Sequence, residues 1–149
     1  AVQRMRAARG AIDAAGGDTV LVGRAECFLV GQPDLEETIR RLKAYSDAGA
    51  DCLYAPGLRT PEQISAVVEA VAPKPFNLLV GSASKLTVAE IAALGVRRIS
   101  VGGALARSAW GGFIRSAKAL AEHGTFGSFA DAAPGGELNA FFQSDVLKR

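Results

Sequence analysis

The spacing of apolar positions changes repeatedly along the chain, and these changes predict helices that alternate with short strands. Residues 2–15 carry apolar side chains at intervals of three and four and end at two glycines, which is typical of a helix and its C-terminal stop. Residues 19–27 begin with a continuous β-branched and aliphatic run and end in charged residues. Such a run, apolar on both faces, predicts a strand of a parallel sheet that is covered by helices.

The same alternation of helix and strand recurs along the rest of the chain. Further strands are predicted at 51–56, 75–80 and 97–102, with helices at 33–48, 60–71, 87–94 and 104–122. Strands that alternate with helices predict an α/β fold, either part of a (β/α) barrel or a doubly wound sheet. A closed (β/α)8 barrel needs eight such units and about 250 residues, so four units in 149 residues do not close one.

A doubly wound nucleotide-binding domain is not supported by the loop after the first strand. That loop reads Gly23-Arg24-Ala25-Glu26, which does not match the glycine-rich phosphate-binding pattern. The segment after residue 125 is glycine-rich and predicts a loop followed by a weak helix.

Composition and charge exclude several classes of protein. The net charge is +2 and the basic residues are dispersed, so we expect no nucleic-acid partner. The densest basic groups have helical spacing and are predicted to lie on solvated helix faces; they are Arg4, Arg6 and Arg9, and Arg40, Arg41 and Lys43. The longest apolar runs cover about five residues, far below the roughly 20 that span a bilayer. The first nine residues lack the apolar centre of a signal peptide. We therefore expect a cytoplasmic protein with no membrane association.

Cysteine and histidine residues do not form a metal-binding pattern. Cys27 and Cys52 lie in apolar runs without a CxxC spacing, which predicts buried free thiols. The single histidine, His123, falls in the last turn of a predicted helix, where a cation complements the helix dipole. Tyr54 and Trp110 occur in apolar contexts and are expected to be packing residues.

Candidate functional residues follow the strands, because ligands bind at the C-terminal ends of strands in such folds. Alternation places Arg24 and Glu26 on the same side of the first strand. Together they could hold an anionic substrate and a metal-bound water, or they could form a structural ion pair at the mouth of the barrel.

Two later strand ends offer further candidates. Asn77 is an amide within an apolar strand, where it would either satisfy neighbouring backbone groups or donate to a substrate carboxylate. Gly81 and Ser82 follow in a loop of small residues that would let an anion approach backbone N–H groups. Gly102 and Gly103 precede the last long helix, where they could bind phosphate or allow close packing.

Five segments together resemble the isocitrate lyase and phosphoenolpyruvate mutase superfamily. They follow one another in the family's order between about residues 2 and 126, at positions 23–31, 35–51, 75–79, 94–102 and 122–126. The resemblance implies a Mg²⁺-dependent (β/α)8 TIM barrel that makes or breaks a C–C or P–C bond beside a 2-oxo acid carboxylate, through an enolate-like intermediate.

The resemblance also implies roles for individual residues. Arg24 matches the arginine that holds a substrate carboxylate or phosphonate, and Glu26 matches the acid beside the water shell of the metal. Asn77 matches an amide that helps to bind substrate carboxylate, and Gly81 and Ser82 lie in the adjoining loop. Tyr54 stands near where many lyase members have a glutamate, which puts specificity for isocitrate or methylisocitrate in doubt.

The family's metal-binding aspartates and its Lys-Lys-Cys-Gly-His loop belong to the region before the matched one. We therefore interpret residues 1–126 as the second half of the barrel, contributing about strands five to eight, and residues 127–149 as a C-terminal tail. The Mg²⁺ ligands are expected in the N-terminal half, with Glu26 acting through water at most. That half of the barrel is an expected partner, as is a second copy of the chain in a homodimer or homotetramer.

The leading hypothesis is a lyase, mutase or hydrolase that acts on a small 2-oxo, 2-hydroxy or phosphono acid. An alternative from another class is a non-catalytic half-barrel that serves as an assembly partner. A third is a phosphate-binding biosynthetic barrel that uses Gly102 and Gly103.

Overall fold

The computed structural model describes residues 1–146, and the chain divides into two compact units, Ala1–Ala104 and Leu105–Arg149. The last three residues of the predicted tail, 147–149, lie outside the described residues. The expected boundary between half-barrel and tail at residue 126 stays a prediction.

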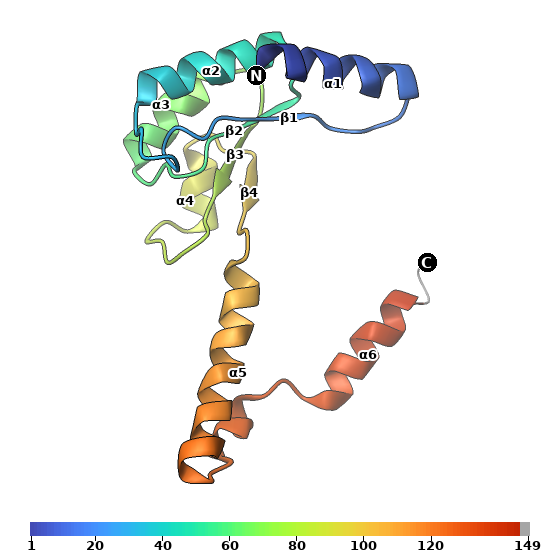
Figure 1. Ribbon diagram of the computed structural model, residues 1–149, viewed down its shortest axis with the longest axis vertical. Helices are drawn as coiled ribbons and strands as arrows, with labels where there is room; N and C mark the ends of the chain where they lie inside the picture. The colour runs from blue at the N-terminus through green and yellow to red at the C-terminus, as the bar shows by residue number, and fades with distance from the viewer. Residues whose placement is uncertain (147–149) are drawn as a thin grey trace. The chain divides into compact units, whose positions relative to one another are not determined.

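The first unit contains four strands that alternate with helices, as predicted (Figure 1). Its elements are α1 (Val2–Ala15), β1 (Val22–Arg24), α2 (Leu35–Asp47), β2 (Cys52–Tyr54), α3 (Pro61–Val71), β3 (Phe76–Leu79), α4 (Val88–Ala93) and β4 (Arg98–Ser100). The strands form one parallel sheet in the order β1-β2-β3-β4. They are shorter than predicted: the expected strand at 19–27 has only three residues in the sheet.

Side-chain caps begin three of the helices directly after the loops that follow the strands. Asp34 accepts a hydrogen bond from the Glu37 N–H at the start of α2. Thr60 and Thr87 form capping boxes at the starts of α3 and α4. These caps satisfy N–H groups that a helix cannot pair internally, and they place each helix start near the carboxyl end of a strand.

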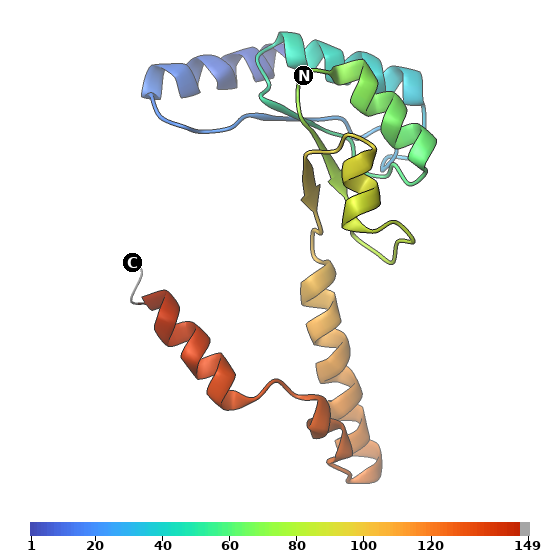
Figure 2. The ribbon, with the colours of Figure 1, turned by 180° about the vertical axis from the view of Figure 1, so that it is seen from behind.

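One face of the sheet packs against helices, and this face forms the core. Gly23 lies so close to α2 that an added Cβ would be 2.8 Å from the Cβ of Tyr45 and 3.2 Å from Leu53 Cδ2. Leu53 and Phe76 are paired across β2 and β3 and are buried on this side. Figures 1 and 2 show α2, α3 and α4 on this side of the sheet, and these helices supply the buried side chains Leu42, Ile64, Val67 and Ile91.

The opposite face carries a row of polar side chains instead of a second apolar layer. Arg24 pairs with Tyr54, Tyr54 with Asn77, and Asn77 with Arg98 in the parallel register. Because side chains alternate along each strand, all four residues lie on the face away from Gly23 and Leu53. The described helices of this unit therefore cover one face of the sheet only.

Asp51 connects α1 to the beginning of the sheet. One carboxylate oxygen accepts hydrogen bonds from Arg9 Nη1 at 2.9 Å and from the Leu21 N–H at 2.8 Å. The Leu21 hydrogen bond, with the charge of Arg9, lowers the pKa of Asp51. Arg9 is thus part of the packing between α1 and the strand ends, and not the solvated side chain that its spacing predicts.

Leu105–Arg149 contains most of α5 (Ala104–His123), the 3-10 helix η1 (Gly127–Asp131) and α6 (Gly135–Val146). His123 lies in the last turn of α5, as predicted. Trp110, expected to be a packing residue, is 61% exposed and meets Phe113 edge-to-face with ring centroids 5.4 Å apart. No helix within residues 1–146 is long and apolar enough to cross a membrane. Cys27 and Cys52 are buried free thiols, as predicted.

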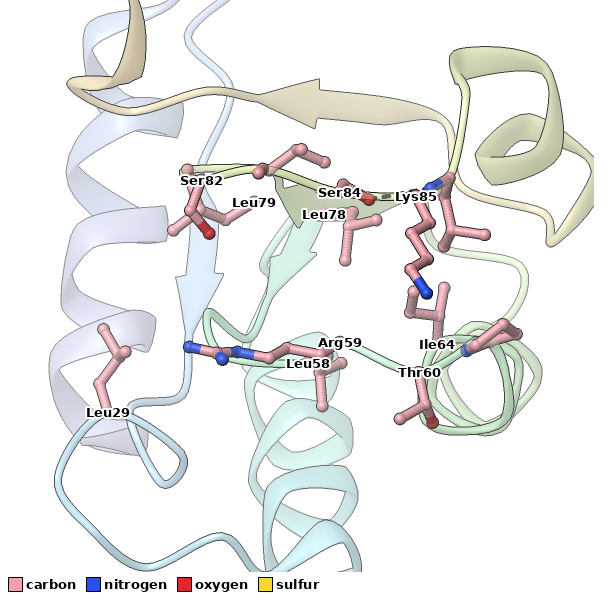
Figure 3. Close-up of a pocket in the computed structure, with 16 residues that line it drawn as sticks. Leu29, Leu58, Arg59, Thr60, Ile64, Leu78, Leu79, Ser82, Ser84 and Lys85 are labelled. Atoms are coloured by element: carbon pink, nitrogen blue, oxygen red, sulfur yellow. Dashed lines mark hydrogen bonds between the residues drawn. The ribbon is translucent and has the colours of Figure 1, made fainter. Parts of the chain in front are cut away.

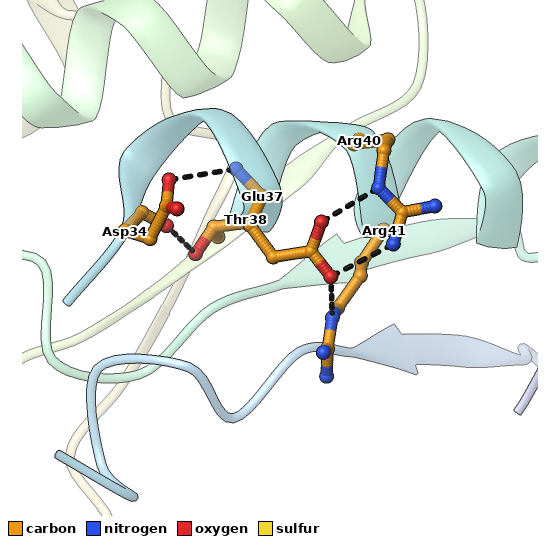
Figure 4. A network of polar contacts seen from close by, with 5 residues as sticks. All are labelled: Asp34, Glu37, Thr38, Arg40 and Arg41. Carbon is orange, nitrogen blue, oxygen red and sulfur yellow. Dashed lines mark hydrogen bonds and ion pairs between the residues drawn. The ribbon is translucent and has the colours of Figure 1, made fainter. Parts of the chain in front are cut away.

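Glu37 is the centre of a polar network on α2 (Figure 4). Its carboxylate accepts hydrogen bonds from Arg40 Nε at 2.6 Å and from Arg41 Nε at 2.7 Å. The neighbouring Thr38 hydroxyl donates to the Asp34 carbonyl at 2.7 Å, so the first turn of α2 is held by side chains on both sides of Glu37. Arg40 and Arg41 are 70% and 41% exposed, so they lie on a solvated face, as their spacing predicts, and form ion pairs with Glu37 there.

The close approach at Gly23 predicts the effect of adding a methyl group. Gly23→Ala should destabilise the full-length protein by about 1–3 kcal/mol, because the new Cβ would overlap Tyr45 and Ala50 in the core. Urea unfolding measures this change. Gly10→Ala is the matched control, since nothing lies within 4 Å of its Cβ position and alanine favours a helix by about 0.5–1 kcal/mol. Equal stability changes in the two variants would contradict the packing at Gly23.

The Glu37 network predicts a specific pH dependence. Hydrogen bonds from Arg40 and Arg41 lower the pKa of Glu37 from 4.5 to about 2. A carboxyl with a depressed pKa in the folded state stabilises the fold above its unfolded pKa, and that contribution disappears as pH falls through the folded pKa. Glu37→Gln should therefore lower Tm at neutral pH, and this deficit should shrink as pH falls from about 4.5 to about 2. Circular dichroism melts across this range measure the effect.

Glu36→Gln is the control for this prediction, since it removes the same charge from the same helical turn. If both variants show the same dependence of Tm on pH, the Glu37 network does not stabilise the folded state.

Candidate functional site

Arg24 and Glu26 lie side by side at the carboxyl end of β1, as alternation predicted. The Ala25 N–H donates to the Tyr54 carbonyl at 2.9 Å, which keeps the backbone extended past the end of the strand. Ala25 is buried, so its two neighbours project from the opposite side. Arg24 Nε lies 2.5 Å from Glu26 Oε1, and Arg24 Nη2 donates to Oε2 at 3.2 Å.

The Arg24 guanidinium is held from two directions. Its carbon lies 4.9 Å from the centroid of the Tyr54 ring, and the paired carboxylate of Glu26 lies along its Nε edge. The hydrogen bond with Glu26 raises the pKa of Arg24, while partial burial opposes this shift. The two side chains are nevertheless 46% and 43% exposed, so both remain accessible to a ligand. Tyr54 is thus a support for Arg24 and not only the packing residue that its context predicts.

Asn77 is fully buried in β3, and its amide bridges two side chains of β4. Its Oδ1 accepts from Arg98 Nη1 at 2.8 Å, and its Nδ2 donates to Ser100 Oγ at 2.9 Å. These partners differ from the backbone groups that one interpretation of the sequence expected. The strand register explains these partners, because Asn77 is paired with Arg98 and Leu79, the next residue of β3 on the same face, is paired with Ser100.

Arg98 and Ser100 are functional candidates that the sequence analysis did not identify. Both lie on the polar face of the sheet, with Arg98 exposed and Ser100 half-buried. Burial raises the pKa of the Cys52 thiol on this face, and the positive charge of Arg98 opposes that shift. The available signal was the alternation of polar, apolar and polar residues through Arg98, Ile99 and Ser100.

Gly81 and Ser82 line a separate pocket at the carboxyl ends of β2 and β3. This pocket has a volume of about 650 Å³ and lies between the loop that precedes α3 and the loop that precedes α4. Figure 3 shows Arg59 and Lys85 extending from these two loops, with Ser82 and Ser84 on one side. The pocket therefore combines an apolar wall with cationic and hydroxyl groups, and sequence analysis missed its two cations.

The structure thus places the predicted residues in two groups. Arg24, Glu26 and Asn77 belong to the polar face of the sheet, where the Tyr54 ring separates the Arg24 pair from the Asn77 bridge. Gly81 and Ser82 belong to the loop pocket, whose described lining residues do not include the other three.

Gly102 has a structural explanation that does not involve phosphate. Its φ is 52°, a conformation that favours glycine, and it lies in a turn where the Ala104 N–H donates to the Val101 carbonyl at 3.0 Å. Among the residues that the structure describes, no group of three or more His, Cys, Asp or Glu side chains could hold a metal ion.

Solved structures with the same fold identify enzymes of one superfamily. The chain is similar to the "putative lyase/mutase" of Burkholderia cenocepacia J2315, with 46% identity and a TM-score of 0.90 over 95% of this chain and 51% of that one. It is similar to oxaloacetate acetylhydrolase bound to 3,3-difluorooxalacetate, with 30% identity and a TM-score of 0.80 over 97% of this chain and 49% of that one. It is also similar to 2,3-dimethylmalate lyase, a member of the PEP mutase/isocitrate lyase superfamily, with 25% identity and a TM-score of 0.81 over 99% of this chain and 52% of that one.

The chain spans about half the length of these solved structures. The family model for phosphoenolpyruvate phosphomutase matches residues 1–121, which include all four strands and every predicted site residue. The resemblance seen in the sequence is thus confirmed: the chain belongs to the phosphoenolpyruvate phosphomutase family, within the PEP mutase/isocitrate lyase superfamily.

Proposed function

We propose that this chain supplies strands five to eight of a (β/α)8 barrel whose full-length form is a Mg²⁺-dependent, cytoplasmic lyase, mutase or hydrolase. Its substrate is a small 2-oxo, 2-hydroxy or phosphono acid, and a C–C or P–C bond forms or breaks through an enolate-like intermediate. The observation that carries this proposal is the row of Arg24, Tyr54, Asn77 and Arg98 across the sheet face that α2, α3 and α4 leave uncovered.

The uncovered polar face favours a half-barrel over a doubly wound sheet. A doubly wound sheet has helices on both faces and apolar side chains to meet them, whereas the described helices of the first unit pack against one face. The edge strands β1 and β4 each pair with one strand only among the described residues. A barrel would pair both edges with further strands and would enclose the polar face in its interior.

Arg24 is the proposed group that binds the substrate carboxylate or phosphonate. A guanidinium has five N–H donors in one plane, and Glu26 uses the edge formed by Nε and Nη2. The Nη1 and outer Nη2 hydrogens remain for a second, bidentate contact with an anion. Glu26 and Tyr54 therefore hold the guanidinium in position without occupying all of its donors.

The other predicted residues have complementary proposed roles. Gly81 and Ser82 would contact a more distant part of an acidic substrate, since their pocket also contains Arg59 and Lys85. Asn77 is fully buried, so its proposed contribution to substrate binding passes through the side chains that it holds.

The Mg²⁺ ion and the remaining strands require residues from outside this chain. We propose that the Mg²⁺ ligands belong to the N-terminal half of the barrel, as the family resemblance implies, with Glu26 contributing through water at most. That half is the first proposed partner. Assembly into a homodimer or homotetramer is the second.

The half-barrel proposal predicts the size of the natural polypeptide. Mass spectrometry of the purified full-length protein should give a mass nearly twice the 15.4 kDa of this chain, since a barrel of this type contains about 250 residues. A mass near 15.4 kDa would instead favour a non-catalytic half-barrel that acts as an assembly partner.

The Arg24 proposal predicts a loss of activity that depends on side-chain geometry. We expect the full-length protein to consume at least one small acid from a panel that includes oxaloacetate and 2,3-dimethylmalate, with Mg²⁺ present. Arg24→Ala should lower kcat/KM by about 100-fold because two charge-assisted hydrogen bonds are lost. The kcat/KM of Arg24→Lys should lie between those of the wild-type protein and Arg24→Ala, since lysine keeps the positive charge but lacks the planar pair of donors.

Arg97→Ala is the control, because Arg97 has the same charge but donates to the Val96 carbonyl and is not part of the polar row. Activity that survives Arg24→Ala as well as it survives Arg97→Ala would contradict the role proposed for Arg24. A panel in which no acid is consumed, together with no binding of oxalate as a carboxylate probe, would reject the enzymatic proposal.

A further inference from the structure

The uncovered face of the sheet contains two groups on β4 to which the proposed function gives no direct contact with a ligand. Arg98 is exposed at the beginning of the strand, and Ser100 is half-buried at its carboxyl end. The Asn77 amide connects them, with Oδ1 facing Arg98 and Nδ2 facing Ser100. The three side chains therefore form a continuous chain of hydrogen bonds along the uncovered face of the sheet.

Arg98 determines which way the Asn77 amide points. A guanidinium has no acceptor, so it can face only the oxygen end of an amide. The Ser100 hydroxyl can both donate and accept, so by itself it is compatible with either amide orientation. Arg98 is thus the group that places Nδ2, and not Oδ1, against Ser100.

This orientation has a consequence for the Ser100 hydroxyl. Because Ser100 Oγ accepts from Asn77 Nδ2, its own hydrogen must point elsewhere. Among the described residues Ser100 Oγ accepts this hydrogen bond and donates none, and the strand end at which Ser100 lies is the end where substrates bind in barrels. A cation followed by two aligned hydrogen bonds also polarises the final O–H as a donor.

We propose that Ser100 is an additional anion-binding residue, and that Arg98 and Asn77 are positioning residues that hold its hydroxyl as a donor. The ligand is a carboxylate or phosphonate oxygen of the acidic substrate. This inference rests on the proposed function, since it adds a contact to the same site. It also assigns Asn77 an indirect role, which agrees with its complete burial.

Calorimetric titration of the full-length protein with oxalate, in the presence of Mg²⁺, tests this assignment. Ser100→Ala should raise the oxalate Kd by about tenfold, because one hydrogen bond to a charged group is lost. Arg98→Met should raise it by a similar factor, and Arg98→Lys should recover most of the affinity, since an ammonium can also donate to Oδ1. Arg97→Met is the matched control, because it removes the same charge from the adjacent position and should leave Kd within about twofold.

The double variant separates positioning from direct contact. If Arg98 acts through Ser100, then Arg98→Met should add little to the effect of Ser100→Ala, and the two losses should be far from multiplicative. If instead the increases in Kd from the two single variants multiply in the double variant, Arg98 binds the anion independently of Ser100. That result would overturn the positioning role of Arg98. Unchanged affinity in Ser100→Ala would overturn the assignment of Ser100.

Two controls keep the outcomes distinct. If Ser100→Ala does not fold, Ser100→Cys carries the same test, because its thiol can still accept from Asn77 but is a weak donor, so the same loss of affinity is expected. Wild-type protein that does not bind oxalate refutes the proposed function and this inference with it. Wild-type binding combined with unchanged affinity in the Ser100 variants refutes this inference alone.

Discussion

The helices that alternate with these strands cover only one face of the sheet, and most features of the first unit follow from this constraint. Gly23, Leu53 and Phe76 face the helices, where close packing demands small or apolar side chains. No described helix of this unit packs against the other face, and this face carries charged and amide groups. Such groups would be costly to bury in a packed interior unless they were paired. The same sheet thus has one face that forms the core and one face of polar side chains.

The register of the strands determines both which side chains face the helices and which lie on the uncovered face. Side chains alternate with a period of two, so a slip of one residue in any strand would move its polar member into the helix-packed core. In β1 such a slip would also bring Arg24 against α2, at the point where even a methyl group at Gly23 would overlap Tyr45. The packing that excludes a side chain at Gly23 therefore also holds Arg24 on the uncovered face, opposite Tyr54.

The sequence was sufficient to predict the elements and the position of the Arg24 pair, because both depend on local patterns. Capping residues such as Thr60 and Thr87 mark helix starts, and alternation places Arg24 beside Glu26. The Asn77 bridge could not be predicted in this way, since its partners lie on another strand and depend on register across the sheet. The ends of β1 could not be predicted either, because an apolar run such as 19–22 does not show which of its residues pair in the sheet.

The polar face is organised so that each group that could bind a ligand is held by another side chain. Glu26 and Tyr54 hold Arg24, while Asn77 connects Arg98 to Ser100. Fixing these side chains before a ligand arrives lowers the entropy that binding must overcome. It also keeps the positive charges of Arg24 and Arg98 in hydrogen-bonded positions on a face that a complete barrel would enclose. Enclosure would then strengthen their attraction for an anionic substrate, because water would no longer screen it.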